Sequence, residues 1–506
     1  MADKTIRTLY FLAAVILLLP SLFFPISHDL SIFLLGAETI AEGGKIYVDY
    51  IDLKPPAVYY FFTIPYMIFG DSEMGIRIFG FLWQLLTVGT MFYVISKRTG
   101  KIVAAGISII LYSMYLSGTN YYNTLQIETL AGLPVLWILY LLSGEINNRR
   151  LLISSLLAGA LTAFKPTFGL ILILIIIISI YHKRDFKRIL SYMLFFAAPV
   201  ILSLLPLLDP EIRNGFFEVL SFLKAYAGGD ESLAGFIKGL IKFTSEYLGN
   251  NLSFAVIIPA FFILIKSKED RRLISVSYLL FFFLFLSMLW EGKYFAYHYA
   301  RFLIPLFLLS GLGIDYLFRH GYLRLKGKDF YSKLIIITLA VLFIIFSPLP
   351  RWLRVAPLSY LYFKSEESYN SYLHNDRLPG FRRYEHYQAG NFIKKHKKKG
   401  DTLVVSGIGS SSIYQIADVD NTSAFASSAF YFSKLAPDIW YNKYINEVKN
   451  ADWLIIQRND PDHFFMKHDL TTMESFLANE ELNKILDSRY SKVFETEIMI
   501  VYRAND

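Results

Sequence analysis

Residues 9–24 read LYFLAAVILLLPSLFF, a long apolar run without a charged residue. With its flanks it extends over 7–26, which is the roughly 20 residues that a helix needs to cross the hydrocarbon core of a bilayer. Lys4 and Arg7 precede the run, as in a secretory signal peptide, but no small-residue cleavage site follows it. The run therefore predicts a retained first transmembrane helix.

Similar apolar runs recur as far as residue 348 and predict about eleven transmembrane helices. A single helix over 150–181 would be about 47 Å long, too long for one crossing, so two short helices broken at Lys165-Pro166 are predicted. The predicted spans are 7–26, 74–96, 101–118, 127–143, 150–164, 167–181, 189–207, 252–266, 272–290, 301–318 and 332–347.

The composition agrees with a membrane protein. Hydrophobic residues make up 54% of the chain and charged residues 18%, against about 25% charged residues in soluble domains. The net charge of +8 comes from Lys and Arg clusters between apolar runs, as in cytoplasmic loops. No basic stripe follows one soluble surface, so no nucleic-acid partner is predicted. The chain has no Cys, which excludes disulfides, thiolate nucleophiles and Cys-ligated metals.

The orientation follows from the apolar segment 57–69, which is too short to cross the membrane and predicts a surface or re-entrant segment. If it does not cross, every compact basic cluster falls on one side, as the positive-inside rule requires. The expected protein is an α-helical polytopic protein of the plasma membrane, the inner membrane of a bacterium, with a cytoplasmic N-terminus. Residues 1–348 form its transmembrane domain, with outer loops 27–73 and 208–251, and residues 349–506 form an extracytoplasmic domain.

The outer loop 208–251 carries apolar residues at helical spacing, which predicts amphipathic helices. Such helices either lie on the bilayer surface or pack on the soluble domain, and the sequence leaves both alternatives open. The residues of the two patterns are Phe216, Leu220 and Leu223, and Phe236, Leu240 and Phe243.

The C-terminal domain is predicted to be a small α/β domain. Residues 401–417 predict a strand, a Gly/Ser turn and a helix, and 453–456 and 498–502 predict two further strands. The turn at 407–412, GIGSSS, lacks the third glycine of a dinucleotide-binding fingerprint and indicates no nucleotide site.

The first outer loop carries the residues that suggest chemistry. Asp29 directly follows the first span, and Lys54 precedes Pro55-Pro56, which hold the backbone extended. Lys54 is thus presented on a stiff segment next to the bilayer surface, where it could bind a lipid phosphate. Arg77, at the start of the second span, could bind the same group.

The ordered motif of this loop resembles GT-C glycosyltransferases, in particular the dolichyl-phosphate-mannose protein mannosyltransferases and the bacterial aminoarabinose lipid A transferase. One departure is Asp29-Leu30, where the family usually has Asp-Glu, so any role of that Glu is open. The matching residues are Asp29, Ala37, Gly44, Tyr47, Asp49, Lys54, Pro55, Pro56, Phe69, Gly70 and Arg77.

The resemblance implies that a sugar moves from a polyprenyl-phosphate donor to a lipid, glycan or protein acceptor at the outer face of the membrane. Such a reaction needs a base for the acceptor hydroxyl and cations for the leaving phosphate. Asp29 is the predicted base, for an in-line attack with inversion, and Lys54 and Arg77 are the predicted phosphate partners.

Further charged residues lie at predicted outer helix ends. Glu128 is predicted to position the acceptor or assist the base, or else it merely favours a helix N-terminus. Lys165 is predicted to face the phosphate, the alternative being a side chain that snorkels to the interface. His298 and Arg301 could bind phosphate or belong to an aromatic belt.

Metal binding and other membrane functions are alternatives to this interpretation. Asp49 and Asp52, with Glu128, could hold a divalent cation through hard oxygens, but their spacing forms no closed metal loop and no metal ligand is assigned. A transporter or flippase should place charges or broken helices at the midplane, whereas most charges outside the basic clusters lie in outer loops. A lipid-linked glycan polymerase or ligase is the remaining alternative.

Overall fold

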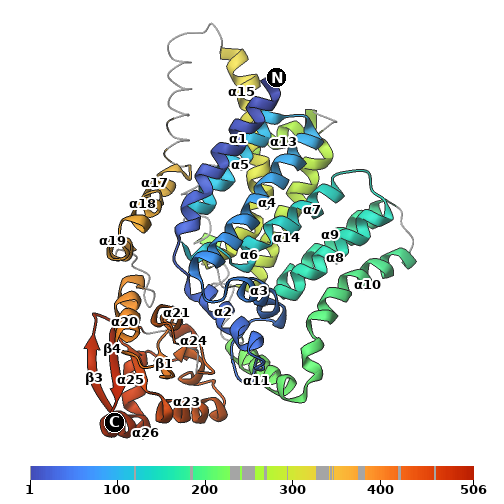
Figure 1. Ribbon diagram of the computed structural model, residues 1–506. Coiled ribbons are helices and arrows are strands. Elements are labelled where there is room, and N and C mark those ends of the chain that lie inside the picture. Colours follow the sequence, from blue (N-terminus) through green and yellow to red (C-terminus); the bar gives the residue numbers. More distant parts are fainter. Residues whose placement is uncertain are drawn as a thin grey trace. The chain divides into compact units, whose positions relative to one another are not determined.

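The computed structural model is mostly helical (Figure 1). It describes residues 2–118, 121–182, 186–227, 257–266, 270–292, 295–325, 347–373, 382–419, 423–460 and 463–505, and the single residues 237, 240, 241, 341 and 345. The chain forms two compact units, each assembled from three segments. The first unit is Met1–Phe24, Arg77–Ser203 and Asp230–Ser359, and the second is Pro25–Ile76, Leu204–Gly229 and Tyr360–Asp506.

The first unit is a helical bundle. Its α-helices are α1 (Ala2–Leu18), α4 (Glu73–Thr99, which begins in the second unit), α5 (Ile102–Gly118), α6 (Ile127–Leu130), α7 (Gly132–Leu142), α8 (Asn148–Phe164), α9 (Leu170–Tyr181), α10 (Phe186–Ser203), α13 (Ile257–Lys266), α14 (Arg271–Glu291), α15 (Leu303–Leu325) and α17 (Leu349–Val355). Its 3₁₀ helices are η1 (Leu19–Phe23), η2 (Tyr121–Asn123), η3 (Pro166–Gly169) and η7 (Ala296–Phe302).

Small residues let the helices of this bundle approach closely, as expected where lipid removes most of the hydrophobic drive for helix association. α5 packs against both α1 and α15. A Cβ atom added at Gly106 of α5 would collide with the ring of Tyr10 on α1. A Cβ added at Gly311 of α15 would collide with Ser108 and with the backbone of α5.

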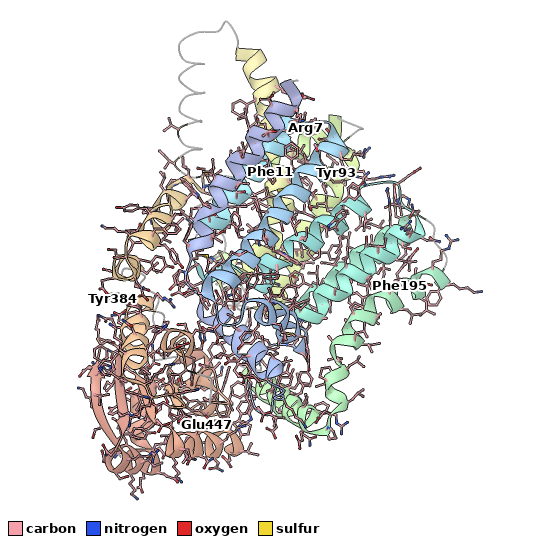
Figure 2. All side chains as sticks on the ribbon, in the orientation of Figure 1. Arg7, Phe11, Tyr93, Phe195, Tyr384 and Glu447 are labelled. Atoms are coloured by element: carbon pink, nitrogen blue, oxygen red, sulfur yellow. The ribbon has the colours of Figure 1, made fainter. Side chains whose placement is uncertain are left out.

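The apolar helices make the chain a multi-pass membrane protein. Five of the described helices are long and apolar enough to cross a bilayer, over Asp3–Phe23, Glu73–Thr99, Phe186–Ser203, Arg271–Glu291 and Tyr297–Arg319. Shorter apolar helices cover Pro56–Phe69, Ile102–Gly118, Ile127–Leu142 and Pro166–Tyr181. Exposed aromatic side chains such as Phe11, Tyr93 and Phe195 project from α1, α4 and α10, as expected of surfaces that face lipid (Figure 2).

The described helices coincide closely with the predicted spans. The predicted break at Lys165-Pro166 is confirmed, because α8 ends at Phe164 and η3 begins at Pro166. The predicted span 332–347 and the second amphipathic pattern at 236–243 lie almost wholly outside the described residues, so the full number of spans stays a prediction.

The second unit combines the first predicted outer loop with the C-terminal part of the chain. A four-stranded sheet in the order β1-β2-β4-β3 lies in this unit; β1 and β2 are parallel, and the other pairs are antiparallel. The strands are β1 (Leu403–Ser406), β2 (Trp453–Gln457), β3 (Tyr490–Glu495) and β4 (Met499–Ala504). The helices are α2 (His28–Ala41), α3 (Pro56–Phe69), η4 (Leu205–Leu208), α11 (Pro210–Ala227), α18 (Pro357–Lys364, which begins in the first unit), α19 (Glu366–Tyr372), α20 (Arg383–His396), α21 (Ser412–Ala417), α22 (Ser428–Tyr431), α23 (Asp438–Asn450), α24 (His463–Met466), α25 (Thr472–Ala478) and α26 (Glu480–Arg489).

Helix α11 covers the first amphipathic pattern of the predicted loop 208–251. Its Phe222 is buried, with its ring centroid 5.4 Å from that of Trp440 on α23. Trp440 Nε1 donates a hydrogen bond of 3.2 Å to Glu218 of α11. One face of α11 therefore packs within the second unit, while Phe217 and Leu220 remain exposed on the same helix.

Candidate functional site

The predicted first outer loop, residues 27–73, is held in place by hydrogen bonds from tyrosine hydroxyls. Tyr47 donates to the carbonyl of Lys54 at 2.6 Å, and Tyr50 donates to the carbonyl of Ile32 in α2 at 2.8 Å. Tyr59, in the helix after the two prolines, donates to Asp52 at 2.5 Å. These bonds fix the backbone on both sides of Lys54, so its position does not depend on Pro55-Pro56 alone.

Asp29 and Lys54 lie on the same side of α2. Ser27 caps this helix by accepting from Leu30 N at 3.3 Å, which places Asp29 in the first turn, where a negative charge is favourable. The Lys54 ammonium lies 5.9 Å from the ring centroid of Phe33. Phe33 is one helical turn beyond Asp29, and residues four apart share a helix face.

The charges of Asp29 and Lys54 both affect the pKa of His28. Burial is the largest cause that lowers its pKa to about 4; the Asp29 carboxylate opposes this effect and Lys54 adds to it. His28 Nδ1 lies 2.8 Å from Ser411 Oγ in the GIGSSS turn, which also lies 2.5 Å from Ser31 Oγ of α2. The glycine- and serine-rich turn thus packs against the start of α2, a structural role that its sequence did not indicate.

A second group of charged residues, here called the ion cluster, lies in the first unit. Lys165 Nζ contacts Glu128 at 2.5 Å and Glu291 at 2.7 Å. Arg301 Nη2 contacts the same two carboxylates at 3.1 and 2.6 Å, and His298 Nε2 lies 3.0 Å from Glu291. Arg301, His298 and Glu128 are each 1% exposed, whereas the side chains of Lys165 and Glu291 keep 18% and 12% of their surface accessible to water. When His298 is neutral, the two negative charges of Glu128 and Glu291 equal the two positive charges of Lys165 and Arg301.

The cluster forms because its members lie where helices begin, end or break. Glu128 is in the first turn of α6, Lys165 stands between α8 and η3, and Arg301 lies in η7. Glu291 is the last residue of α14, before Gly292 in the left-handed conformation at φ 68°. The sequence analysis missed Glu291. A negative side chain is unfavourable at a helix C-terminus, which already carries partial negative charge. This unusual position of Glu291 could have marked it as a candidate functional residue.

Glu128, Glu291 and His298 offer oxygen and nitrogen atoms within 4.8 Å of one another, a geometry that could hold a metal ion. Both carboxylates already contact Lys165 and Arg301, however. A divalent cation in this position would face two cations at close range, which is unfavourable in a buried site. The donor set therefore fits an ion-pair network better than a metal.

Three other residues from the sequence analysis have architectural contacts. Arg77 is 2% exposed and donates to the carbonyl of Phe24 at 2.6 Å and to Thr124 at 3.1 Å, which ties the end of η1 to the turn before α6. Asp49 accepts from the backbone of Lys45 at 2.7 Å, and Asp52 accepts from Tyr59. These contacts stabilise the bundle and the loop. They give Arg77, Asp49 and Asp52 structural roles that do not require contact with a substrate.

Comparison with known proteins shows which fold the chain shares. Residues 53–207 match the family model described as Dolichyl-phosphate-mannose-protein mannosyltransferase. The structure of ArnT from Cupriavidus metallidurans bound to undecaprenyl phosphate is similar, with a TM-score of 0.58 and 14% identity over 98% of this chain and 97% of that chain. The apo state of the same protein gives the same score and identity over 99% and 98%.

The archaeal oligosaccharyltransferase AglB from Archaeoglobus fulgidus, in complex with an inhibitory peptide and a dolichol-phosphate, is also similar. Its TM-score is 0.52 at 11% identity, over 100% of this chain and 74% of that chain. No curated protein sequence matches the chain significantly. The chain thus has the fold of the GT-C membrane glycosyltransferases, and the resemblance seen in the outer-loop motif is confirmed.

Proposed function

We propose that the protein is an inverting glycosyltransferase that moves a sugar from a polyprenyl-phosphate donor to an acceptor at the outer face of the membrane. The observation that carries the proposal is the placement of Asp29 and Lys54 on one side of α2, with both charges acting on His28. The similarity to ArnT, solved with undecaprenyl phosphate, supports a lipid-linked donor.

The reaction assigns one task to each residue. The Asp29 carboxylate accepts the proton of the acceptor hydroxyl as the oxygen attacks the anomeric carbon of the donor. A new carbon–oxygen bond forms there while the bond to the phosphate oxygen breaks on the opposite face, so the anomeric configuration inverts. The electron pair leaves with the polyprenyl phosphate, whose charge Lys54 stabilises.

The residues of the ion cluster are proposed to have a role other than proton transfer. Glu128 is in contact with Lys165 and Arg301 and is proposed to position the acceptor rather than to exchange protons. Lys165, His298 and Arg301 already contact carboxylate oxygens of the cluster. A phosphate could bind to one of them only if the phosphate oxygens replaced these carboxylate oxygens. Arg77 is proposed to support the fold of the site, because its guanidinium binds Phe24 and Thr124.

The experiment is an assay of the purified protein with polyprenyl-phosphate sugars and a panel of glycan, lipid and peptide acceptors. Transfer with inversion, read from the anomeric proton coupling of the product, is the expected result. Transfer only from nucleotide sugars, or with retained configuration, would overturn the proposal. The matched control is the variant Glu42→Gln, an exposed acid at the end of α2 that has no assigned role.

The orientation is proposed to be cytoplasmic for the N-terminus and extracytoplasmic for the C-terminal domain. The chain has no Cys, so a single introduced Cys is a clean reporter. In intact cells a membrane-impermeant maleimide is expected to label Asn446→Cys and not Lys97→Cys, both of which replace exposed residues. The reverse labelling would contradict the proposed topology.

A further inference from the structure

Three arginines converge on the last turn of α7 and the loop that follows it, where Gly144 is buried. Arg98 from α4 donates to the carbonyl of Tyr140 at 2.5 Å, and Arg272 from α14 donates to the carbonyl of Gly144 at 2.7 Å. Arg150 from α8 donates to the carbonyl of Glu145 at 2.9 Å. A Cβ atom added at Gly144 would collide with the guanidinium groups of both Arg98 and Arg150. These three residues are here called the arginine triad.

Unlike Lys165 and Arg301 of the ion cluster, the triad has no carboxylate partner among the described residues. Within the part of the chain that the structure describes, no carboxylate forms an ion pair with Arg98, Arg150 or Arg272. The acid nearest in sequence, Glu145, is exposed and contributes only its carbonyl to Arg150, and Asp270 is paired with Lys101.

Three guanidinium groups around one loop repel each other unless an anion compensates them. The C-terminal end of α7 supplies roughly half a negative charge, which leaves most of the positive charge uncompensated. The Nε atom of Arg98 is buried and has no hydrogen-bond partner among the described residues. Guanidinium groups suit phosphate because their planar fork can donate two parallel hydrogen bonds.

We propose that the arginine triad binds the phosphate group of an anionic ligand, either the headgroup of a phospholipid or free phosphate. The site lies at the end of helices that carry the Lys and Arg clusters predicted to face the cytoplasm. Basic pockets between transmembrane helices on that side attract anionic lipid headgroups. This site is separate from the proposed transfer reaction, and its test does not require activity.

The test titrates the purified full-length protein with two probes. One arm uses nanodiscs of phosphatidylcholine with rising fractions of phosphatidylglycerol, and the other uses inorganic phosphate in detergent. The readout is the midpoint of thermal unfolding, which rises when a ligand binds the native state. Saturable stabilisation by phosphatidylglycerol identifies a lipid headgroup, and saturable stabilisation by phosphate identifies the free anion.

Matched variants show whether the triad is responsible. Arg272→Gln and Arg150→Gln are each expected to weaken the apparent affinity about fivefold, from about 1 kcal/mol per basic residue near an anionic lipid. Their sequence neighbours Arg271→Gln and Arg149→Gln remove the same charge from exposed positions outside the triad and should keep the wild-type affinity. Arg98→Gln would also remove the hydrogen bond to the Tyr140 carbonyl in the last turn of α7 and could destabilise that helix. The test therefore uses Arg150 and Arg272.

Two results would overturn the proposal. One is the absence of saturable stabilisation by either probe. The other is equal weakening by all four variants, which would indicate a diffuse positive surface rather than a site.

Discussion

Asp29 and Glu128 are both acids in the first turn of a helix, but their surroundings differ. Asp29 is partly exposed at the start of α2, near His28 and Lys54. Glu128 is 1% exposed at the start of α6, with Lys165 and Arg301 in contact with its carboxylate. A base must be reachable by its substrate, whereas the Glu128 carboxylate is buried and already in contact with two cations. The comparison agrees with the proposal that Asp29 accepts the proton and Glu128 positions the acceptor.

The largest expected effect is on transfer by Asp29→Asn. Loss of a general base typically lowers the rate by about 10²–10⁴-fold, and the amide cannot accept the proton. The unfolding temperature should stay near that of wild type, because Asp29 is partly exposed. Initial rates and thermal unfolding of the same preparations check both statements. If Glu42→Gln lowered the rate equally, the loop as a whole, and not Asp29, would be responsible.

The second prediction concerns stability. Glu128→Gln removes one of two acids from a buried, balanced cluster and should lower the free energy of unfolding by about 3–5 kcal/mol. A second change, Lys165→Met, should recover part of that loss, because Glu291 and Arg301 then remain as one acid and one base. Thermal unfolding of the two single variants and the double variant measures this coupling. No recovery in the double variant would mean that charge balance does not hold the cluster together.

The smallest expected effect is the pH response of His28. Its pKa is lowered to about 4, so the folded protein binds this proton less readily than the unfolded chain does. The resulting stability is present above the ordinary His pKa of about 6.5 and is lost as the pH falls toward 4. His28→Gln should make the unfolding temperature less dependent on pH between these values. An unchanged dependence would place the titrating group elsewhere.

The sequence predicted the features that depend on local pattern. Apolar length located the helices, and Lys165-Pro166 marked a break because proline cannot continue a helix. Strand β3 was missed because its middle residues are mostly exposed and show no regular alternation of apolar and polar residues. Motif order pointed to Asp29 and Lys54, and the structure places them on one side of α2.

Residues brought together from distant helices could not be predicted in the same way. Glu291 joins Glu128 only when α14 and α6 pack, and Arg98, Arg150 and Arg272 meet only at the loop after α7. In the sequence the arginines belong to separate basic clusters that are predicted to face the cytoplasm. Their convergence depends on helix packing, which charge patterning does not determine.

The most direct test of the account measures undecaprenyl phosphate binding and single-turnover transfer on the same samples of wild type, Asp29→Asn and Lys54→Ala. The account predicts that Asp29→Asn binds the carrier like wild type but does not transfer the sugar. Lys54→Ala should lose carrier affinity, because it removes the ammonium that is proposed to bind the phosphate. If Asp29→Asn transferred at the wild-type rate, or if both variants lost binding and transfer alike, the division of tasks between the two residues would be wrong.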